Sequence, residues 1–268
     1  VSETLGIDAE KIRVVEGDTS QHSFGSGTGA ARTATICGSV VLLAAKKTRK
    51  KAKKIAAYML EAADDDIEFD NGNFKVAGTD RSVTLAEIVD IAFEPKKMPP
   101  GMEFGLYETA SWSPETTNIP NTYHVCEVEI DPDTGTSKMV RYAAVHDVGV
   151  ELNPVLVDGQ VIGGIAQGAG QALMEQMVYD PDGQVITGSF MDYCMPRASD
   201  FCEFKLDRHP VPTATNPLGV KGAGEGGTVG ALGAVMNAVN NALEPLGVHN
   251  IGMPATSEKV WQAIQEAG

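Results

Sequence analysis

Several protein classes are excluded by what this sequence lacks. It contains no apolar run long enough to span a bilayer, so we expect no membrane span. Basic residues are also few, because 21 Lys and Arg stand against 36 Asp and Glu and leave a formal net charge of −15. Such an acidic chain argues against nucleic acid or an anionic membrane surface as its partner, and we expect neither.

Cysteine is scarce and unsuitably spaced for metal binding. The chain has four, at positions 37, 126, 194 and 202, and no two of them form a C-x-x-C pair. Zinc or iron–sulfur ligation within the chain is therefore not expected. Free thiols in a reducing compartment, the cytoplasm, are the simplest interpretation.

An initiator methionine is missing as well. Residues 1–6, with the sequence VSETLG, are typical of a helix followed by its C-cap glycine. We therefore expect the chain to be a fragment of a longer polypeptide or an excised domain.

Glycine, in contrast, is abundant and concentrated in three segments, near residues 25–33, 159–170 and 219–230. Each is expected to lead into a helix or to lie on one. A glycine-rich loop before a helix places free backbone N–H groups and the positive end of the helix dipole beside a bound anion. No segment has the Walker pattern, and the G-x-G-x-x-G match at 222–227 follows no convincing strand.

The segment 216–243 contains one cation, Lys221, and one carboxylate, Glu225, among six glycines in twelve residues. Like charges repel, so a carboxylate is a poor phosphate ligand. We interpret Glu225 as a catalytic base beside the reactive end of a large anionic cofactor that several loops hold together.

Gln160 and Gln167 lie seven residues apart, so they share one face of the helix expected there. Gln160 is a candidate amide donor to a ligand. An ordinary surface glutamine is the alternative, and the spacing favours neither.

The remaining patterns predict an α+β (α/β mixed) fold with mixed or antiparallel sheets and glycine-led helices in two lobes. A Pro- and Lys-rich segment at 94–101 suggests lobes at 1–98 and 99–268. The expected elements are a strand at 12–18, a long helix at 33–63, a hairpin at 67–76, a second hairpin at 123–130 and 138–147, helical character from Val229 onward and a final helix at 257–267.

The segment 216–225, with the sequence NPLGVKGAGE, resembles the C-terminal signature of the molybdenum hydroxylases. These are the large subunits of the xanthine dehydrogenase, aldehyde oxidase and aerobic carbon monoxide dehydrogenase family. The sequence of this segment most resembles the carbon monoxide dehydrogenase-like branch. Residues 14–19 with 27–32 resemble the first pterin-binding loop of the family, and residues 147–161 with 167–168 resemble its second. The resemblance covers nearly all of residues 1–268 and corresponds to the second, C-terminal molybdopterin-binding domain.

The resemblance implies a molybdenum–molybdopterin cofactor, usually the cytosine dinucleotide form in bacteria, with no protein ligand to the metal. Glu225 would take a proton from a metal-bound hydroxide, and the oxygen would attack an electron-poor carbon of the substrate. Lys221 would orient or partly neutralise Glu225, with a structural salt bridge as the equally weighted alternative. The residues expected at the cofactor are Gly27, Thr28, Gly29, Ala30, Ala31, Arg32, Gln160, Lys221, Gly222 and Gly224.

The implied partners are a preceding molybdopterin-binding domain and iron–sulfur and FAD domains or subunits, in a complex that dimerises. One competing hypothesis is an isolated or non-catalytic domain of the same fold, inactive without its partner. Another is an unrelated phosphate-binding module. The sequence does not identify the substrate, because in this family the substrate pocket comes largely from the preceding domain.

Overall fold

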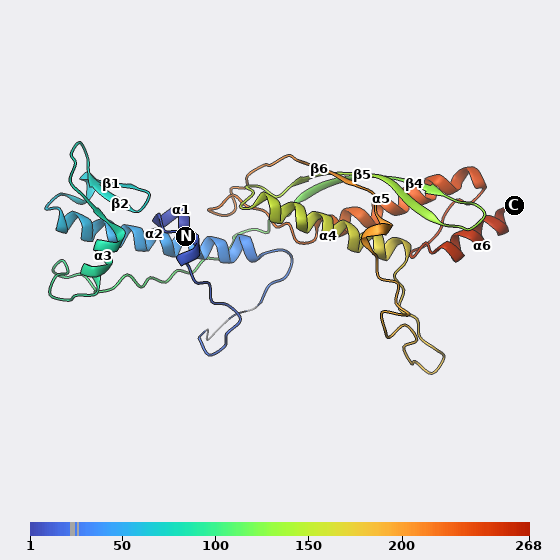
Figure 1. The fold of residues 1–268 in the computed structure, drawn as a ribbon, viewed down its shortest axis with the longest axis horizontal. Helices are drawn as coiled ribbons and strands as arrows, with labels where there is room; N and C mark the ends of the chain where they lie inside the picture. Colours follow the sequence, from blue (N-terminus) through green and yellow to red (C-terminus); the bar gives the residue numbers. More distant parts are fainter. Residues whose placement is uncertain (22–24, 26) are drawn as a thin grey trace. The chain divides into compact units, whose positions relative to one another are not determined.

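A computed structural model describes residues 1–21, 25 and 27–268 (Figure 1). The chain divides into two compact units. Unit 1 comprises residues 1–28, 33–115 and 216–218, and unit 2 comprises residues 29–32, 116–215 and 219–268. Within the described part, no helix is long and apolar enough to cross a membrane.

Unit 1 combines a long helix with a small antiparallel sheet of strand order β1-β2-β3. The core face of α2 presents Ala52, Ile55 and Ala56, which cluster with Phe74 and Ile88, all of them fully buried. The elements of this unit are α1 (Ser2–Leu5), α2 (Thr33–Met59), β1 (Ile67–Asp70), β2 (Asn73–Val76), β3 (Ser82–Thr84) and α3 (Leu85–Ala92), with 3₁₀ turns at Ala9–Lys11 and Asp64–Asp66.

The local signals in unit 1 explain these boundaries. Asn71 and Gly72 have φ values of 42° and 83°, the left-handed conformation that a two-residue hairpin turn requires, so the predicted hairpin is confirmed. Thr84 caps α3, because its hydroxyl accepts a hydrogen bond from the Glu87 N–H at 3.2 Å while the Glu87 carboxylate accepts from the Thr84 N–H at 2.7 Å.

Unit 2 has a mixed sheet in which β4 pairs antiparallel with β5, and β5 pairs parallel with β6. Figure 1 shows α4 and α5 running along the sheet, and buried residues of both helices share one core with Met139, Tyr142 and Ala144 of β5. The elements are β4 (Asn121–Ile130), β5 (Ser137–Asp147), α4 (Pro154–Leu173), β6 (Phe204–Arg208), α5 (Gly226–Leu243) and α6 (Ser257–Ala267), with 3₁₀ turns at Ala198–Asp200 and Glu244–Leu246.

Three of the predicted elements need correction. No strand forms at 12–18, since the short alternation there finds no neighbouring strand, and Gly17 is left-handed with φ 69°. The helix expected at 33–63 ends at Met59, just before Glu61 turns left-handed at φ 47°. Helix α5 begins at Gly226 instead of Val229, because its glycine-rich first turn packs closely against α4 through Gly227.

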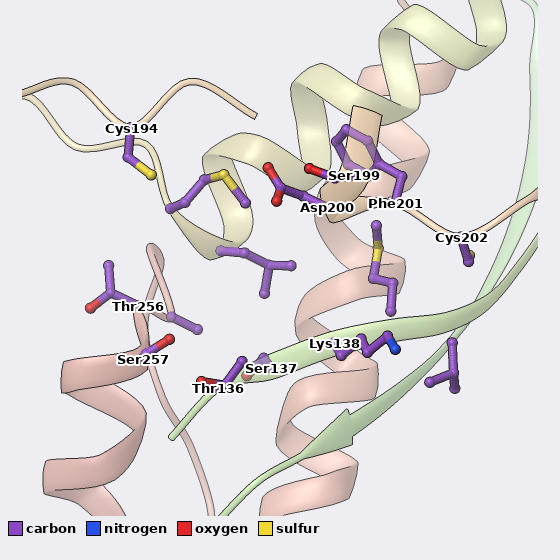
Figure 2. Close-up of a pocket in the computed structure, with 15 residues that line it drawn as sticks. Thr136, Ser137, Lys138, Cys194, Ser199, Asp200, Phe201, Cys202, Thr256 and Ser257 are labelled. Carbon is purple, nitrogen blue, oxygen red and sulfur yellow. The ribbon is translucent and has the colours of Figure 1, made fainter. Parts of the chain in front are cut away.

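A cavity of about 800 Å³ opens in unit 2 near the start of β5, the end of α4 and the start of α6 (Figure 2). Hydroxyl side chains such as Ser137 and Ser257 line it together with apolar ones such as Leu173 and Phe201. None of the cofactor-binding residues predicted from the sequence belongs to its lining.

Helices α4 and α5 approach each other closely along a line of glycines. A Cβ at Gly168 would lie 2.6 Å from the Thr228 carbonyl oxygen, and one at Gly164 would lie 2.9 Å from the Thr228 nitrogen. From α5, a Cβ at Gly227 would lie 2.4 Å from the Val161 carbonyl oxygen. The small residues of α4 are therefore needed for backbone-to-backbone packing.

We expect the substitution Gly168→Ala to lower the free energy of unfolding by about 1–3 kcal/mol, since the added methyl group would force the two backbones apart. Gly163→Ala is the matched control, because nothing lies within 4 Å of its Cβ position. The control should be neutral or stabilise by up to about 1 kcal/mol through helix propensity. Urea denaturation of the intact protein checks both, and equal effects would contradict this account of the packing.

Candidate cofactor site

The glycine-rich segment before α5 is tied by its backbone to the turn that follows β5. The Val150 N–H donates to the Gly219 carbonyl at 2.9 Å, and the Lys221 N–H donates to the Val148 carbonyl at 2.7 Å. Gly149 itself has φ 67°, and a Cβ there would lie 2.3 Å from the Gly219 carbonyl oxygen. Only glycine fits this crossing, which fixes where residues 219–225 leave the sheet.

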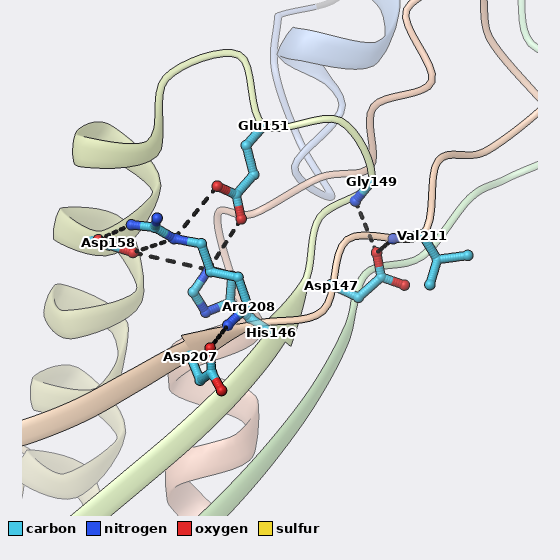
Figure 3. Close-up of polar contacts among 8 residues, drawn as sticks. All are labelled: His146, Asp147, Gly149, Glu151, Asp158, Asp207, Arg208 and Val211. Carbon is cyan, nitrogen blue, oxygen red and sulfur yellow. Dashed lines mark hydrogen bonds and ion pairs between the residues drawn. The ribbon is translucent and has the colours of Figure 1, made fainter.

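A buried carboxylate, Asp147, lies at the centre of this crossing. Its Oδ1 accepts hydrogen bonds from the backbone N–H groups of Gly149 at 2.9 Å and Val211 at 3.0 Å (Figure 3). Its Oδ2 accepts from Lys221 Nζ at 2.5 Å and from the Asn121 amide at 3.4 Å. Burial raises the pKa of the Asp147 carboxyl, but Lys221 and these N–H donors outweigh it and lower the pKa to about 2.

The ammonium of Lys221 is therefore engaged with Asp147, and the two side chains are only 11% and 10% exposed. This pair is the structural salt bridge that was the alternative for Lys221. The pair neutralises the buried carboxylate. It also anchors residues 219–225, called the glycine loop below, at a point four residues before Glu225.

At its other end, the glycine loop lies directly on residues 29–32. A Cβ at Gly222 would lie 2.5 Å from the Ala31 Cβ and 2.7 Å from its carbonyl oxygen, and a Cβ at Gly224 would lie 3.4 Å from the Ala31 Cβ. Ala30 and Ala31 are left-handed, with φ 50° and 53°, a conformation that is uncommon for residues other than glycine. Strained backbone of this kind concentrates at ligand sites.

Helix α4 adds two amides to the same region. Gln160 Nε2 donates to the Gly224 carbonyl at 2.8 Å. About two helical turns further along α4, Gln167 Oε1 accepts from the Thr228 hydroxyl at 3.1 Å. Both glutamines thus face the segment that leads into α5, as their spacing predicts. The exposed Gln160 amide retains a second N–H for a ligand.

Glu225 occupies the N-cap position of α5, and its side chain is exposed. No described residue holds its carboxylate by a hydrogen bond, since the cap makes no side-chain bond. The first N–H groups of α5 and the positive end of its dipole favour a negative charge at this position. The carboxylate is therefore free to act on a bound group.

Most of the predicted site residues fall within unit 2, where Ala31, Gln160, Gly222 and Gly224 come together beside Glu225. Gly27 and Thr28 belong to unit 1, and Gly27 is left-handed with φ 66°. Position 26 of the first glycine-rich segment, 25–33, lies outside the described residues.

A partly buried cluster of titratable and charged side chains at the end of β5 was not predicted from the sequence (Figure 3). His146 Nε2 lies 3.7 Å from Glu151 Oε1 and 3.9 Å from Asp158 Oδ1, and Arg208 pairs with both carboxylates. These four residues join β5, the following loop, α4 and β6. The sequence gives only a weak signal for this cluster, because Arg208 lies about fifty residues or more from the other three and no local pattern pairs it with them.

Metal-binding side chains do not gather anywhere in the part of the chain that the structure describes. In particular, no group of three or more His, Cys, Asp or Glu residues there has the arrangement of a metal site.

Comparison with known proteins shows the family of the chain. Residues 1–202, three quarters of the chain, match the family described as the molybdopterin cofactor-binding domain. The chain belongs to this family.

Similar sequences include the carbon monoxide dehydrogenase large chain of Hydrogenophaga pseudoflava, which is 36% identical over 99% of this chain. The nicotine 6-hydroxylase large subunit of Paenarthrobacter nicotinovorans is 39% identical over 98% of this chain. Both matches cover 33% of the relative, so this molybdopterin cofactor-binding domain spans about a third of the length of these curated relatives.

Solved structures agree with the fold. A reconstituted carbon monoxide dehydrogenase from Oligotropha carboxidovorans matches 100% of this chain and 33% of its own, with a TM-score of 0.92 and 33% identity. Quinoline 2-oxidoreductase from Pseudomonas putida 86 matches 91% of this chain and 31% of its own, with a TM-score of 0.83 and 36% identity. The predicted α+β fold and molybdenum hydroxylase resemblance are confirmed.

The Asp147 carboxylate predicts a specific pH dependence of stability. Its pKa of about 2 lies below the ordinary value of 3.8, so its contribution of about 2 kcal/mol is present above pH ~4 and is lost as the pH falls toward 2. Asp147→Asn should remove this component, so the difference in unfolding free energy between wild type and variant should shrink across that window.

Asp133→Asn, at an exposed turn position, is the control and should track the wild type throughout. A difference between wild type and Asp147→Asn that stays constant from pH 5 to 2 would show that the carboxylate charge is not what stabilises the crossing.

Proposed function

We propose that this domain forms one side of the cofactor site in the molybdenum-containing large subunit of a hydroxylase or dehydrogenase, with Glu225 as the catalytic base. The single observation that carries the proposal is the convergence of Ala31, Gly222, Gly224 and Gln160 beside the Glu225 carboxylate, which no described residue holds by a hydrogen bond. The named activities of the relatives support the same class of reaction.

The residues present fit a pterin cofactor. Glycine and alanine at 29–31, 222 and 224 leave the backbone uncovered, and a methyl group at Gly222 has no room against Ala31. The donors are backbone N–H groups and the Gln160 amide, which suit a large group with several oxygen and nitrogen acceptors. Lys221 is neutralised by Asp147, so Glu225 brings the uncompensated charge of the glycine loop.

The residues at the proposed site have distinct tasks. Residues 29–32 and the Gln160 amide, all of unit 2, bind and orient the cofactor. Gly222 and Gly224 let the backbone approach it. When bound, the molybdenum–pterin group supplies two-electron redox chemistry and activates water as the oxygen source.

Glu225 holds and moves the proton. Its carboxylate accepts a proton from the oxygen that attacks the substrate carbon, and the α5 N-terminus stabilises the carboxylate before transfer. Lys221 affects this step only by holding the glycine loop in position, because its ammonium is paired with the Asp147 carboxylate.

The wider assembly follows from the size of the relatives. We propose that a preceding molybdopterin-binding domain completes the site and that iron–sulfur and FAD domains or subunits carry the electrons away, in a dimeric complex. The cofactor is proposed in its cytosine dinucleotide form. The alternative, a domain that is inactive without its partner domain, predicts the same fold but no turnover.

Glu225→Gln in the intact complex should lower kcat by about 10²–10⁴-fold while molybdenum and pterin contents stay unchanged, because the amide cannot accept the proton. Turnover is measured with an artificial electron acceptor on carbon monoxide, nicotine and quinoline, the compounds named in the relatives. Glu244→Gln, at the exposed far end of α5, is the matched control. A loss below about tenfold with cofactor bound would show that Glu225 is not the base.

Gly222→Ala should lower the cofactor content of the purified complex, since its methyl group would displace residues 29–32. Gly233→Ala, with nothing within 4 Å of the new Cβ, should leave it unchanged. Molybdenum analysis by mass spectrometry and pterin fluorescence report both. Equal cofactor content in the two variants would remove this loop contact from the cradle.

A further inference from the structure

The inner face of β4 presents two polar side chains to the first turns of α5. A Cβ at Gly226 would lie 3.8 Å from the Thr122 Cγ2, and a Cβ at Gly230 would lie 2.4 Å from the His124 Cδ2. Gly226 and Gly230 are four residues apart, so they share one face of the helix. The helix that begins directly after Glu225 therefore rests on Thr122 and on the imidazole of His124.

Both nitrogens of the His124 ring have partners. Nε2 lies 2.5 Å from the Thr122 hydroxyl oxygen, and Nδ1 lies 2.6 Å from the Tyr142 hydroxyl oxygen. Tyr142 is only 2% exposed and packs edge-on against His124 at 5.7 Å and against Phe204 at 5.5 Å. The imidazole is thus held in one orientation by a tyrosine that is itself locked in the core.

The charge of this ring also suits its position. Burial, and to a smaller extent the nearby His146, lower the pKa of His124 below its usual 6.5, so the ring is neutral at pH 7. A cation there would face the positive end of α5. A neutral ring with both nitrogens hydrogen-bonded can support the helix start without repelling it.

The connection from this ring to the carboxylate is short. The Val229 N–H donates to the Glu225 carbonyl at 3.1 Å, which closes the first turn of α5, and Gly230 follows immediately. A shift of Gly230 therefore moves the turn that fixes the Glu225 backbone. Because the Glu225 side chain has no bond of its own among the described residues, its placement depends on this backbone.

We infer that His124 is a positioning residue for Glu225, acting through Gly230 and the first turn of α5. The inference rests on the proposed role of Glu225 as the base. It assigns to the Thr122–His124–Tyr142 chain the task of holding the carboxylate in register with the bound cofactor, a task in which a displacement of about 1 Å can cost about 10²-fold in rate.

The test uses the intact, cofactor-loaded complex with His124→Leu, which removes both hydrogen bonds, and His124→Gln, which keeps polar atoms for Thr122 and Tyr142. His249→Leu, an exposed histidine of the same unit, is the matched control. Amide hydrogen exchange at residues 229–231 gives a readout independent of activity. Steady-state kinetics on whichever of the three compounds the wild type oxidises gives kcat and KM.

We expect His124→Leu to speed exchange at 229–231 at least about tenfold and to lower kcat about 10–100-fold with KM within about twofold. His124→Gln should recover most of both, and His249→Leu should match the wild type. Unchanged kcat and exchange in His124→Leu, with Glu225→Gln inactive in parallel, would overturn the positioning role alone. An active Glu225→Gln would instead overturn the proposed function.

Should the His124→Leu complex fail to assemble, Gly230→Ala decides, because its methyl group displaces the same ring from the helix side. Its kcat should fall well below that of Gly233→Ala, which has open space at its Cβ position. Equal kcat in these two glycine variants overturns the inference.

Discussion

The carboxylate of Asp147 receives hydrogen bonds from four separate segments: the start of β4, the turn after β5, the segment after β6 and the glycine loop before α5. Burying a charge is costly unless it is compensated, and here one ammonium and three N–H donors do so. The position of residues 219–225, and with it that of Glu225, depends on this interaction.

The second constraint is close approach of backbones. The glycine loop touches Ala31 through Gly222, crosses Gly149 through Gly219, and continues into a helix whose Gly227 lies on α4. Each contact leaves no room for a side chain. Glycine is abundant here because residues 29–32, helix α4 and the segment 219–230, all of unit 2, approach one another closely. This packing leaves bare backbone beside one exposed carboxylate, that of Glu225.

The sequence predicts those structural features that depend on local rules. The hairpin at 67–76, which turns at Asn71-Gly72, and the final helix at 257–267 follow from turn chemistry and periodicity, and the structure confirms them. The shared face of Gln160 and Gln167 follows from helix geometry in the same way.

Other features could not be predicted, because they depend on contacts between distant residues. Nothing local pairs Lys221 with Asp147, or His124 with Gly230, since their partners are chosen by the packing of α5 on β4 and β5. The strand expected at 12–18 is wrong for the converse reason, because alternation alone does not supply a neighbouring strand. The resemblance to molybdenum hydroxylases identified the candidate site residues, while the structure assigns Lys221 a salt-bridge partner.

In our proposal, Ala31, Gly222, Gly224 and Gln160 form one side of a pterin cofactor site with Glu225 at its reactive end. Determining the structure of the intact, cofactor-loaded complex tests it most directly. We expect the pterin to lie against these four residues and the Glu225 carboxylate to face the molybdenum. A cofactor bound elsewhere, or a Glu225 side chain turned away from the metal, would contradict it.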